Sequence, residues 1–131
     1  MKNNKTILII DDIEENIDIL ERQLTTENFN VLTASEGPKG LHMLKKENVD
    51  LILLDINMPI IDGITLLSNI KEDKSLSHIP IIMVTANDDV KTALKCLKKG
   101  ACGYITKPYS LKQIKKKIIK NLTHHNQLYS S

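Results

Sequence analysis

The sequence predicts an α/β fold in which a doubly wound, five-stranded parallel sheet carries helices on both faces. Three observations support this prediction. Apolar segments alternate five times with segments of helical periodicity, the order that gives parallel strands joined by right-handed crossovers. Three of the apolar segments are nearly continuous in Ile, Leu and Val, as in strands buried on both faces. A length of 131 residues, with 41% hydrophobic and 26% charged residues, suits one globular domain.

Five short apolar segments are the expected strands. They cover residues 6–10, 29–34, 49–54, 79–85 and 102–106, with the sequences TILII, FNVLTA, VDLILL, IPIIMVT and CGYIT. Aromatic residues make up only 3% of the chain, so the predicted core is aliphatic.

The intervals between these segments show the three- and four-residue spacing of amphipathic helices. Lys98, Lys99 and Gly100 form a favourable end for the fourth helix, and Ser110 with Gln113 matches a capping box at the start of the fifth. The apolar residues that define the five helices are Ile13, Ile17, Leu20 and Leu24; Leu41 and Leu44; Ile64, Leu67 and Ile70; Val90, Ala93, Leu94 and Leu97; and Leu111, Ile114, Ile118 and Leu122.

Composition excludes several classes of protein. No apolar run approaches the roughly 20 residues of a membrane span. The N-terminal run ends in two aspartates without a cleavage signal, so we expect a cytoplasmic protein. Cys96 and Cys102 are expected to be reduced, buried thiols rather than a disulfide or metal pair.

The basic residues of the last helix do not predict a nucleic-acid or membrane partner. The net charge is only +2, and a solvated amphipathic face explains such lysines equally well. The residues concerned are Lys112, Lys115, Lys116, Lys117 and Lys120. His124 and His125 are expected to lie exposed in the tail rather than to bind a metal.

Polar side chains follow four of the expected strands, at the sheet edge where ligands gather in this fold class. Asp11 and Asp12 follow the first strand, Asp55 follows the third, Thr85 ends the fourth, and Lys107 follows the fifth. Each alone has a structural explanation, such as a helix cap or a solvated charge. Together, three carboxylates favour Mg²⁺, and a metal, a lysine and a hydroxyl around one carboxylate favour phosphoryl transfer.

The segments ILIIDD, LILLDINMPIIDG, IIMVTA and GYITKP together resemble the response-regulator receiver domain of two-component signalling. The resemblance covers residues 5–122, which are the expected domain. Residues 123–131 are expected to form a flexible tail after a fifth helix that ends near Leu122. The family implies a (βα)5, flavodoxin-like fold with strand order 2-1-3-4-5.

The resemblance implies a role for each residue of the cluster. Asp55 matches the phosphoacceptor. The Mg²⁺ ligands implied are Asp12 directly, Asp11 mainly through water, Asp55 itself and the backbone carbonyl of Asn57, and Mn²⁺ is an alternative ion. The residues implied to contact the phosphoryl group are Thr85, the backbone amide of Ala86, and Lys107.

Four further features follow from the same resemblance. Tyr104 matches the aromatic residue that switches together with Thr85. The Lys107–Pro108 bond is expected to be cis. Asn57 and Asn87 occupy variable positions and are expected to set the lifetime of the phosphoryl group.

The implied function is a phosphoacceptor switch rather than a turnover enzyme. A histidine kinase or histidine phosphotransfer protein would donate the phosphoryl group to Asp55, and the surface of the fourth helix, fifth strand and fifth helix would change. Slow self-dephosphorylation would reset it. We expect a monomer or a weak phosphorylation-dependent dimer with an unknown downstream effector. The chain is either a free-standing receiver or part of a longer regulator.

Three alternatives fit the sequence less well. An aspartate-nucleophile phosphatase needs a second acid where this chain has Asn57. A flavin-binding module needs a hydroxyl- and glycine-rich phosphate loop, whereas DDIEEN follows the first strand. A pseudo-receiver that binds partners without phosphorylation does not need the five site residues, all of which are present.

Overall fold

The computed structural model describes residues 5–129, and side chains as far as residue 123. Five strands alternate with five helices along the chain. The strands are β1 (Thr6–Ile10), β2 (Asn30–Ala34), β3 (Leu51–Leu54), β4 (Ile81–Thr85) and β5 (Gly103–Thr106). The helices are α1 (Glu14–Thr26), α2 (Gly37–Lys46), α3 (Gly63–Glu72), α4 (Val90–Lys98) and α5 (Leu111–Tyr129).

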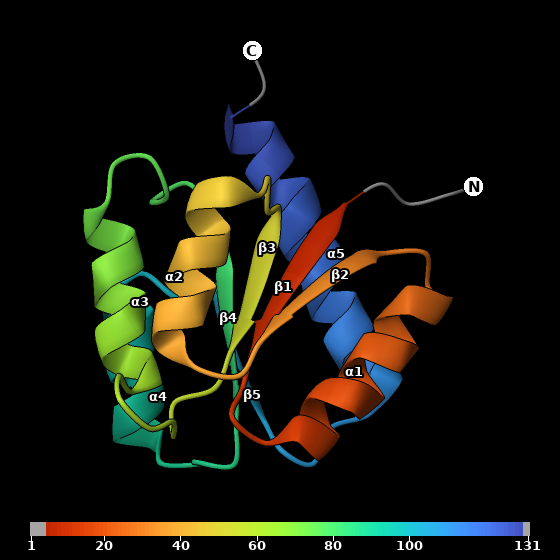
Figure 1. Cartoon of the computed structure of the whole chain (residues 1–131), viewed down its shortest axis with the longest axis horizontal. Coiled ribbons are helices and arrows are strands. Elements are labelled where there is room, and N and C mark those ends of the chain that lie inside the picture. The colour runs from red at the N-terminus through yellow and green to blue at the C-terminus, as the bar shows by residue number, and fades with distance from the viewer. Residues whose placement is uncertain (1–4, 130–131) are drawn as a thin grey trace.

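The strands form one parallel sheet in the order β2-β1-β3-β4-β5, which confirms the predicted architecture and topology. β1 and β3 lie side by side in the centre, with Ile10 in register with Leu54. Residues that follow these two strands therefore emerge next to each other at the carboxyl end of the sheet (Figure 1).

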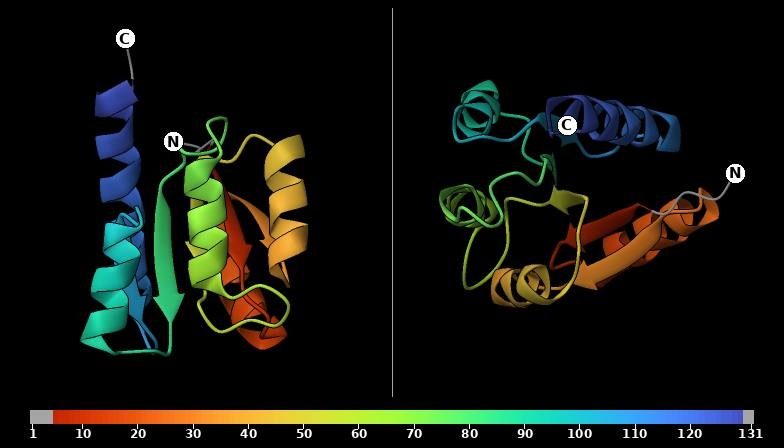
Figure 2. Two further views of the ribbon diagram at one scale, coloured as in Figure 1. Left: turned by 90° about the vertical axis from the view of Figure 1, so that its left-hand side faces the viewer. Right: turned by 90° about the horizontal axis from the view of Figure 1, so that it is seen from above.

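The sheet separates two apolar cores, because alternate residues of each buried strand point to opposite faces. On one face Leu8, Ile52 and Met83 pack with residues of α2, α3 and α4. On the other face Ile9 and Leu53 pack with residues of α1 and α5. The views in Figure 2 show these helices on the two sides of the sheet.

Four strands begin later than the apolar segments predict, and in β5 the start moves from Cys102 to Gly103. Phe29, Val49 and Ile79 are buried, but they precede the hydrogen-bonded ladders of β2, β3 and β4. Composition does not distinguish an apolar residue that enters the core just before a strand from an apolar residue within the strand. Similarly, α1 begins at Glu14, and Ile13 is half exposed at its N-cap.

Two expectations about burial are wrong. Cys96 is a buried free thiol as predicted, but Cys102 is exposed. In α4, Val90, Leu94 and Leu97 face outward, whereas Cys96 is the buried residue of the helix. The inward-facing residues of α4 are small, since Cys96 is buried and Thr92 and Ala93 are half-buried.

The fifth helix starts as predicted but runs further than predicted. The Ser110 hydroxyl accepts a hydrogen bond from the Gln113 backbone amide at 3.1 Å, as in a capping box. The helix continues to Tyr129 rather than ending near Leu122, and its last turns project beyond the sheet (Figure 2). The side chains of His124 and His125 and the last two residues of the expected tail lie outside the described part of the chain.

No helix within residues 5–129 is both long enough and apolar enough to cross a membrane.

Candidate functional site

The sheet ladder fixes the starting points of two aspartates. The Asp11 amide donates to the Ala34 carbonyl at 3.2 Å, and the Asp55 amide donates to the Ile10 carbonyl at 3.0 Å. Both backbones are therefore held by neighbouring strands one residue beyond the ends of β1 and β3. Their side chains are 8% and 6% exposed, so each carboxylate is largely removed from water.

Three carboxylates gather at this edge, as the sequence predicts. Oxygen atoms of Asp11, Asp12 and Asp55 lie within 4.8 Å of one another. Asp12 is exposed, whereas the other two are buried. The Ile13 amide donates to Asp11 Oδ1 at 2.9 Å, which fixes the orientation of that carboxylate. The cluster is thus open to solvent at Asp12, whereas the carboxylate of Asp11 is held in one orientation.

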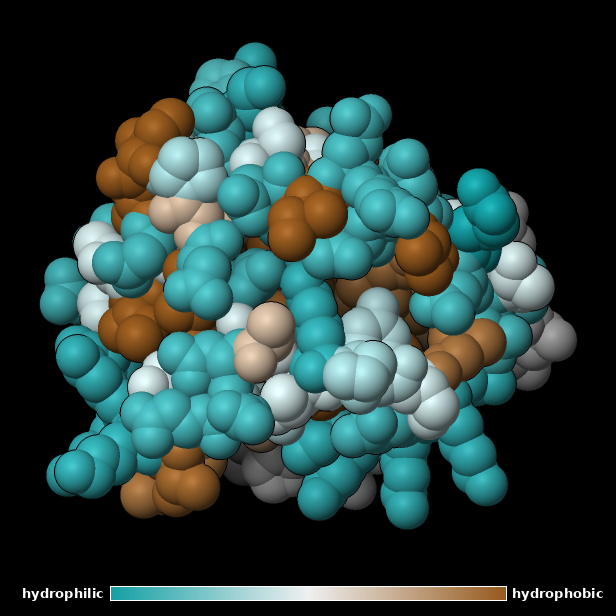
Figure 3. Space-filling model, turned by 90° about the horizontal axis from the view of Figure 1, so that it is seen from below, coloured by the Kyte–Doolittle hydropathy of each residue, from teal (hydrophilic) through white to brown (hydrophobic). Residues whose placement is uncertain are grey.

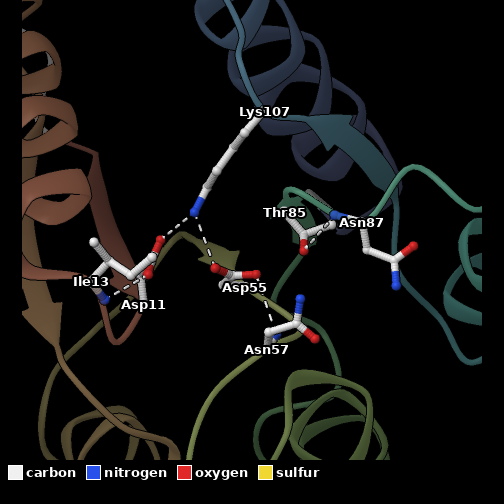
Figure 4. Close-up of polar contacts among 7 residues, drawn as sticks. All are labelled: Asp11, Ile13, Asp55, Asn57, Thr85, Asn87 and Lys107. Carbon is white, nitrogen blue, oxygen red and sulfur yellow. Dashed lines mark hydrogen bonds and ion pairs between the residues drawn. The ribbon is translucent and has the colours of Figure 1, made fainter.

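Lys107 supplies the counter-charge. Its Nζ lies 2.7 Å from Asp11 Oδ2 and 3.1 Å from Asp55 Oδ2 (Figure 4). Burial disfavours the charged ammonium, but the hydrogen bonds that it donates to Asp11 and Asp55, together with their negative charge, outweigh burial and raise the pKa of Lys107 above 10.5. Lys107 therefore stays charged at neutral pH and bridges the two buried carboxylates.

The backbone of Lys107 is also held by a hydrogen bond. Its amide donates to the Thr85 carbonyl at 2.8 Å, which anchors the loop after β5 to the end of β4. The Lys107–Pro108 bond is cis, as expected.

The β3–α3 loop passes very close to Asp55. The Gly63 amide donates to the Ile56 carbonyl at 2.7 Å. A Cβ atom at position 63 would lie 2.0 Å from the Asp55 carbonyl oxygen, so only glycine fits there. Asp62 caps α3 by accepting from the Thr65 amide at 2.9 Å. The Asp62–Gly63 pair therefore starts α3 and supports the backbone of Asp55.

Asn57 lies at the mouth of the site. It is exposed, and its amide contacts Asp55 Oδ1 at 3.4 Å (Figure 4). Ile60 in the same loop has a positive φ of 72°, and the Ile61 amide donates to the Pro59 carbonyl at 2.8 Å. These features describe a tight three-residue turn of the strained kind. Its position was not evident from the sequence, because β-branched residues rarely adopt this conformation.

Thr85 and Tyr104 are connected through the backbone of one residue, Asn87. The Asn87 amide donates to the Thr85 hydroxyl oxygen at 3.3 Å, and the Tyr104 hydroxyl donates to the Asn87 carbonyl at 2.7 Å. Thr85 is fully buried beside Asp55 (Figure 4). Burial, with smaller effects of Cys96 and Asp55, raises the pKa of Tyr104 to about 12, so its hydroxyl stays protonated at neutral pH.

This connection is the part of the site that sequence reasoning missed. The Asn87 side chain does not point to Asp55, because its Oδ1 accepts from the Asp89 amide at 2.9 Å. Asparagine often forms such local turns, and the sequence N-D-D is the signal that could have indicated one. Ala86 is exposed next to Thr85, and the role of its amide stays a prediction.

The charge balance of the cluster suits a divalent cation. Within the described residues, one ammonium, that of Lys107, contacts two of the three carboxylates of the cluster, Asp11 and Asp55. Crowded carboxylates repel one another unless a cation neutralises them. An all-oxygen donor set with few direct carboxylates is typical of Mg²⁺. The residues present therefore fit a magnesium site.

The surroundings of the site are polar. Viewed onto the carboxyl end of the sheet, hydrophilic side chains predominate and apolar ones form separate patches (Figure 3). A groove of about 360 Å³ lies beside Lys107, between α1 and the loop after β5. It is lined by Asn16, Ile19, Gln23, Lys107, Pro108 and Tyr109.

Comparisons with known proteins agree with this geometry. The family model described as "Response regulator receiver domain" matches residues 7–119. The chain is 42% identical over 102 residues to response regulator PleD of Caulobacter vibrioides, with 78% of this chain and 22% of that protein covered. It is 36% identical over 121 residues to chemotaxis protein CheY-3 of Vibrio cholerae, with 92% and 93% covered. The chain thus spans about a fifth of PleD and nearly all of CheY-3.

Solved structures show the same fold. A CheY-like receiver domain from Methanospirillum hungatei superposes with a TM-score of 0.89 at 29% identity, covering 95% of this chain and 98% of that one. The CheY of the CheX–CheY–BeF3–Mg complex from Borrelia burgdorferi gives 0.85 at 33% identity, covering 89% and 88%. Motifs, site geometry, sequence relatives and fold therefore agree, and the chain belongs to the response regulator receiver domain family.

Proposed function

We propose that the chain is a phosphoacceptor switch in which Asp55 takes a phosphoryl group from a phosphohistidine of a histidine kinase or histidine phosphotransfer protein. The observation that carries the proposal is the position of Asp55. Its carboxylate lies at the end of a buried strand, hydrogen-bonded to Lys107 and within 4.8 Å of two further carboxylates. Burying a carboxylate costs several kcal/mol of folding free energy. A role as the modified group explains why the fold places Asp55 there despite that cost.

The transfer step uses groups that the structure brings together. An oxygen of Asp55 attacks phosphorus as the phosphorus–nitrogen bond of the donor breaks, and the electron pair stays on the imidazole nitrogen. Lys107 is the ammonium that can pair with the phosphoryl oxygens, because it already contacts Asp55. The Thr85 hydroxyl oxygen accepts from Asn87, so its proton is available to the phosphoryl group. The Ala86 amide would offer a further donor.

We assign the metal-holding residues as Asp11, Asp12, Asp55 and the carbonyl of Asn57. Bound Mg²⁺, or Mn²⁺ as an alternative, would offset the charge that gathers on the phosphoryl oxygens. A ligand that binds only the folded chain raises its melting temperature. We therefore expect MgCl2 to raise the melting temperature of the wild type and to have little effect on Asp12→Asn. An equal rise in both would contradict the assignment.

The switch follows from the Thr85–Asn87–Tyr104 connection. When Thr85 turns toward the phosphoryl group, its bond from the Asn87 amide is lost, and the Asn87 carbonyl that holds Tyr104 is free to move. Tyr104 lies on β5 beside α4, so its movement would alter the surface of α4, β5 and α5. The phosphoryl group adds about two negative charges and strong acceptors, which supplies the bias between the two states.

Return to the starting state requires water to attack phosphorus and to restore the Asp55 carboxylate. Asn57 lies at the exposed mouth of the site and provides no acid or base for that step. We therefore expect slow self-dephosphorylation, with Asn57 and Asn87 as the positions that set its rate, and no turnover of phosphate esters.

The test is a beryllofluoride titration followed by NMR, since beryllofluoride mimics a phosphoryl group on aspartate. The Borrelia relative is described as a complex containing BeF3 and Mg, which makes this probe suitable. We expect shifts of the Thr85, Asn87 and Tyr104 amides in the wild type and in the control Asp18→Asn, whose carboxylate is exposed on α1. Asp55→Asn should show none. The same shifts in Asp55→Asn, or none in the wild type, would contradict the proposal.

A further inference from the structure

Strand β2 forms one edge of the sheet. It pairs with β1 on one side, and within residues 5–129 no strand pairs with its outer side. The Asn30 amide donates to the Lys5 carbonyl at 2.9 Å, so the backbone of Asn30 is directed toward β1. Alternate residues of a strand direct their backbone groups to opposite sides. The amides and carbonyls of Val31 and Thr33 are therefore directed to the outer edge.

This edge lacks the features that commonly protect an edge strand. Natural edge strands are often blocked by a charged side chain, a proline or a bulge. β2 has the sequence NVLTA, without a charge or a proline, and its five residues pair with β1 in unbroken register. An edge of this kind is able to accept a further strand, with main-chain hydrogen bonds as the source of affinity.

A groove of about 830 Å³ lies at the carboxyl end of this edge, between α1 and α2. Thr33 and Ala34 line it from the strand. Ile17 of α1 and Pro38 and Met43 of α2 contribute apolar surface. We call it the β2 groove. An extended segment laid along the outer edge of β2 would occupy it.

The two sides of the β2 groove differ in chemistry. On the α1 side Glu14, Asp18 and Glu21 follow the i, i+4, i+7 spacing of one helix face, and all three line the groove. On the α2 side Pro38 and Met43 are apolar and half-buried. Side chains of a strand alternate between the two faces of a sheet. A segment added to β2 would therefore direct every second side chain toward carboxylates and the others toward apolar surface.

The β2 groove is acidic as a whole. Asp12 and Glu36 also line it, which brings the number of carboxylates to five. Among the described residues that line the groove, Lys39 is the one Lys or Arg. Five carboxylates and one ammonium, with His42 neutral, give a formal charge of −4. Such a field attracts and orients a basic partner.

We infer that the outer edge of β2 docks an extended segment of a partner protein in which lysine or arginine alternates with apolar residues. The segment adds a strand to β2, its basic side chains meet the acidic face of α1, and its apolar side chains meet Pro38 and Met43. A second copy of the chain is not the favoured occupant, because it would bring the same formal charge of −4 to the groove. β2 and β5 are opposite edges of the sheet (Figure 2), so this docking site is separate from the surface that we propose to switch.

The probe is a fluorescein-labelled synthetic peptide in which Lys and Val alternate over eight positions. Binding to the full chain is followed by fluorescence anisotropy at two salt concentrations. One control peptide alternates Glu and Val, and the other has the composition of the probe with all Lys before all Val. We expect binding of the alternating Lys–Val peptide, weaker at higher salt, and little binding of either control.

Hydrogen exchange followed by NMR locates the peptide on the backbone. The outward amides of Val31 and Thr33 gain acceptors when a strand is added to β2. Their exchange should therefore slow by about tenfold or more in the presence of saturating probe peptide. The alternating Glu–Val peptide at the same concentration should leave it unchanged.

Two variants with matched controls test the backbone and the charge separately. Thr33→Pro removes an outward amide and keeps the pairing with β1, because proline is tolerated on the outer side of an edge strand. It should weaken binding about tenfold, since a lost hydrogen bond contributes up to roughly that factor, whereas Thr33→Val keeps the amide and should bind as the wild type does. Asp18→Lys should weaken binding about fivefold. Glu15→Lys should not, because Glu15 is exposed on α1 outside the groove.

Several outcomes would overturn the inference. These are no binding by the wild type, equal binding of the peptide with all Lys before all Val, unchanged exchange of Val31 and Thr33 with the probe bound, or equal losses in Asp18→Lys and Glu15→Lys. If Thr33→Pro fails to fold, the exchange of the two amides in the wild type still decides. Protection of these amides that rises with protein concentration in the absence of peptide would identify a second copy as the occupant, against the inference.

Failure of this inference and failure of the proposed function are distinguishable. The β2 groove does not include Asp55, so Asp55→Asn should bind the probe peptide as the wild type does. That result is expected whatever the beryllofluoride titration shows, and loss of peptide binding in Asp55→Asn would contradict a docking site on β2.

Discussion

Gly63→Ala is the substitution that tests most sharply how the fold supports Asp55. The added Cβ would lie 2.0 Å from the Asp55 carbonyl oxygen and 2.7 Å from Ile56 Cα, whereas ordinary contact begins at 3.4 Å. Both contacts are with backbone, which cannot rotate away as a side chain can. The loop or the end of β3 must therefore move by about 1 Å or more. Overpacking of this kind costs about 3 kcal/mol.

The same movement displaces the proposed phosphoacceptor. A misplacement of about 1 Å lowers reaction rates by up to about 100-fold, so we expect slower phosphorylation of Asp55 by acetyl phosphate as well as lower stability. The assays are urea unfolding followed by circular dichroism and the rate of phosphoryl incorporation. Gly103→Ala is the control, because its Cβ would meet nothing closer than 3.5 Å, and we expect a change within about 0.5 kcal/mol.

A Gly63→Ala variant that unfolds at the wild-type urea concentration and is phosphorylated at the wild-type rate would contradict this role of Gly63. Equal destabilisation by Gly63→Ala and Gly103→Ala would also refute it, since the contact distances at the two positions differ so strongly.

Three further predictions concern stability, and each is checked by urea unfolding. Gly40→Ala should gain about 1 kcal/mol of helix propensity but lose more, because its Cβ would lie 2.6 Å from Ile10 Cδ1. Ile10→Val removes that atom, so the double variant should recover by about 2 kcal/mol, and strictly additive effects would contradict this. Ile60→Gly should stabilise the chain by about 1 kcal/mol, since glycine adopts the observed φ of 72° without strain; a loss would contradict the assigned turn. Lys107→Met should destabilise the chain by about 2 kcal/mol at pH 7 by leaving Asp55 unpaired. Because the folded-state pKa of Lys107 is raised, its contribution is present below pH 10.5 and disappears as the pH rises through the raised value. If the difference in stability between Lys107→Met and the wild type persisted undiminished above the raised pKa, it would not come from the charge of Lys107.

Much of the fold follows directly from the sequence. Strands β1, β3 and β4 consist almost entirely of apolar residues, and a parallel sheet is the arrangement that buries both of their faces. The gathering of Asp11, Asp55 and Lys107 also follows, because each comes directly after a strand and parallel strands end at one edge.

Helix α4 shows where periodicity is insufficient. Its spacing predicts a helix correctly, but periodicity alone does not tell which side of the helix faces the sheet. Cys96 lies inside and Leu94 outside, although leucine is the larger apolar residue. A prediction that places every apolar stripe in the core therefore assigns Val90, Leu94 and Leu97 to the wrong side of this helix.

The details of the site depend on backbone geometry that residue types do not reveal. The turn at Ile60 and the close approach of Gly63 to Asp55 arise from the path of one loop. The backbone amide and carbonyl of Asn87 link Thr85 to Tyr104. Hydrogen bonds of the main chain do not depend on the residue type, so the sequence does not indicate them. These are the features for which the structure was required.

The central claim is that Asp55 is the group this domain modifies. The most direct measurement is to incubate the chain with acetyl phosphate and MgCl2, reduce the acyl phosphate with borohydride and locate the modified residue by peptide mass spectrometry. We expect one modified residue, Asp55, and no modification of Asp55→Asn under the same conditions. Modification of another residue in the wild type, persistence of modification in Asp55→Asn, or an unmodified wild-type chain would contradict it.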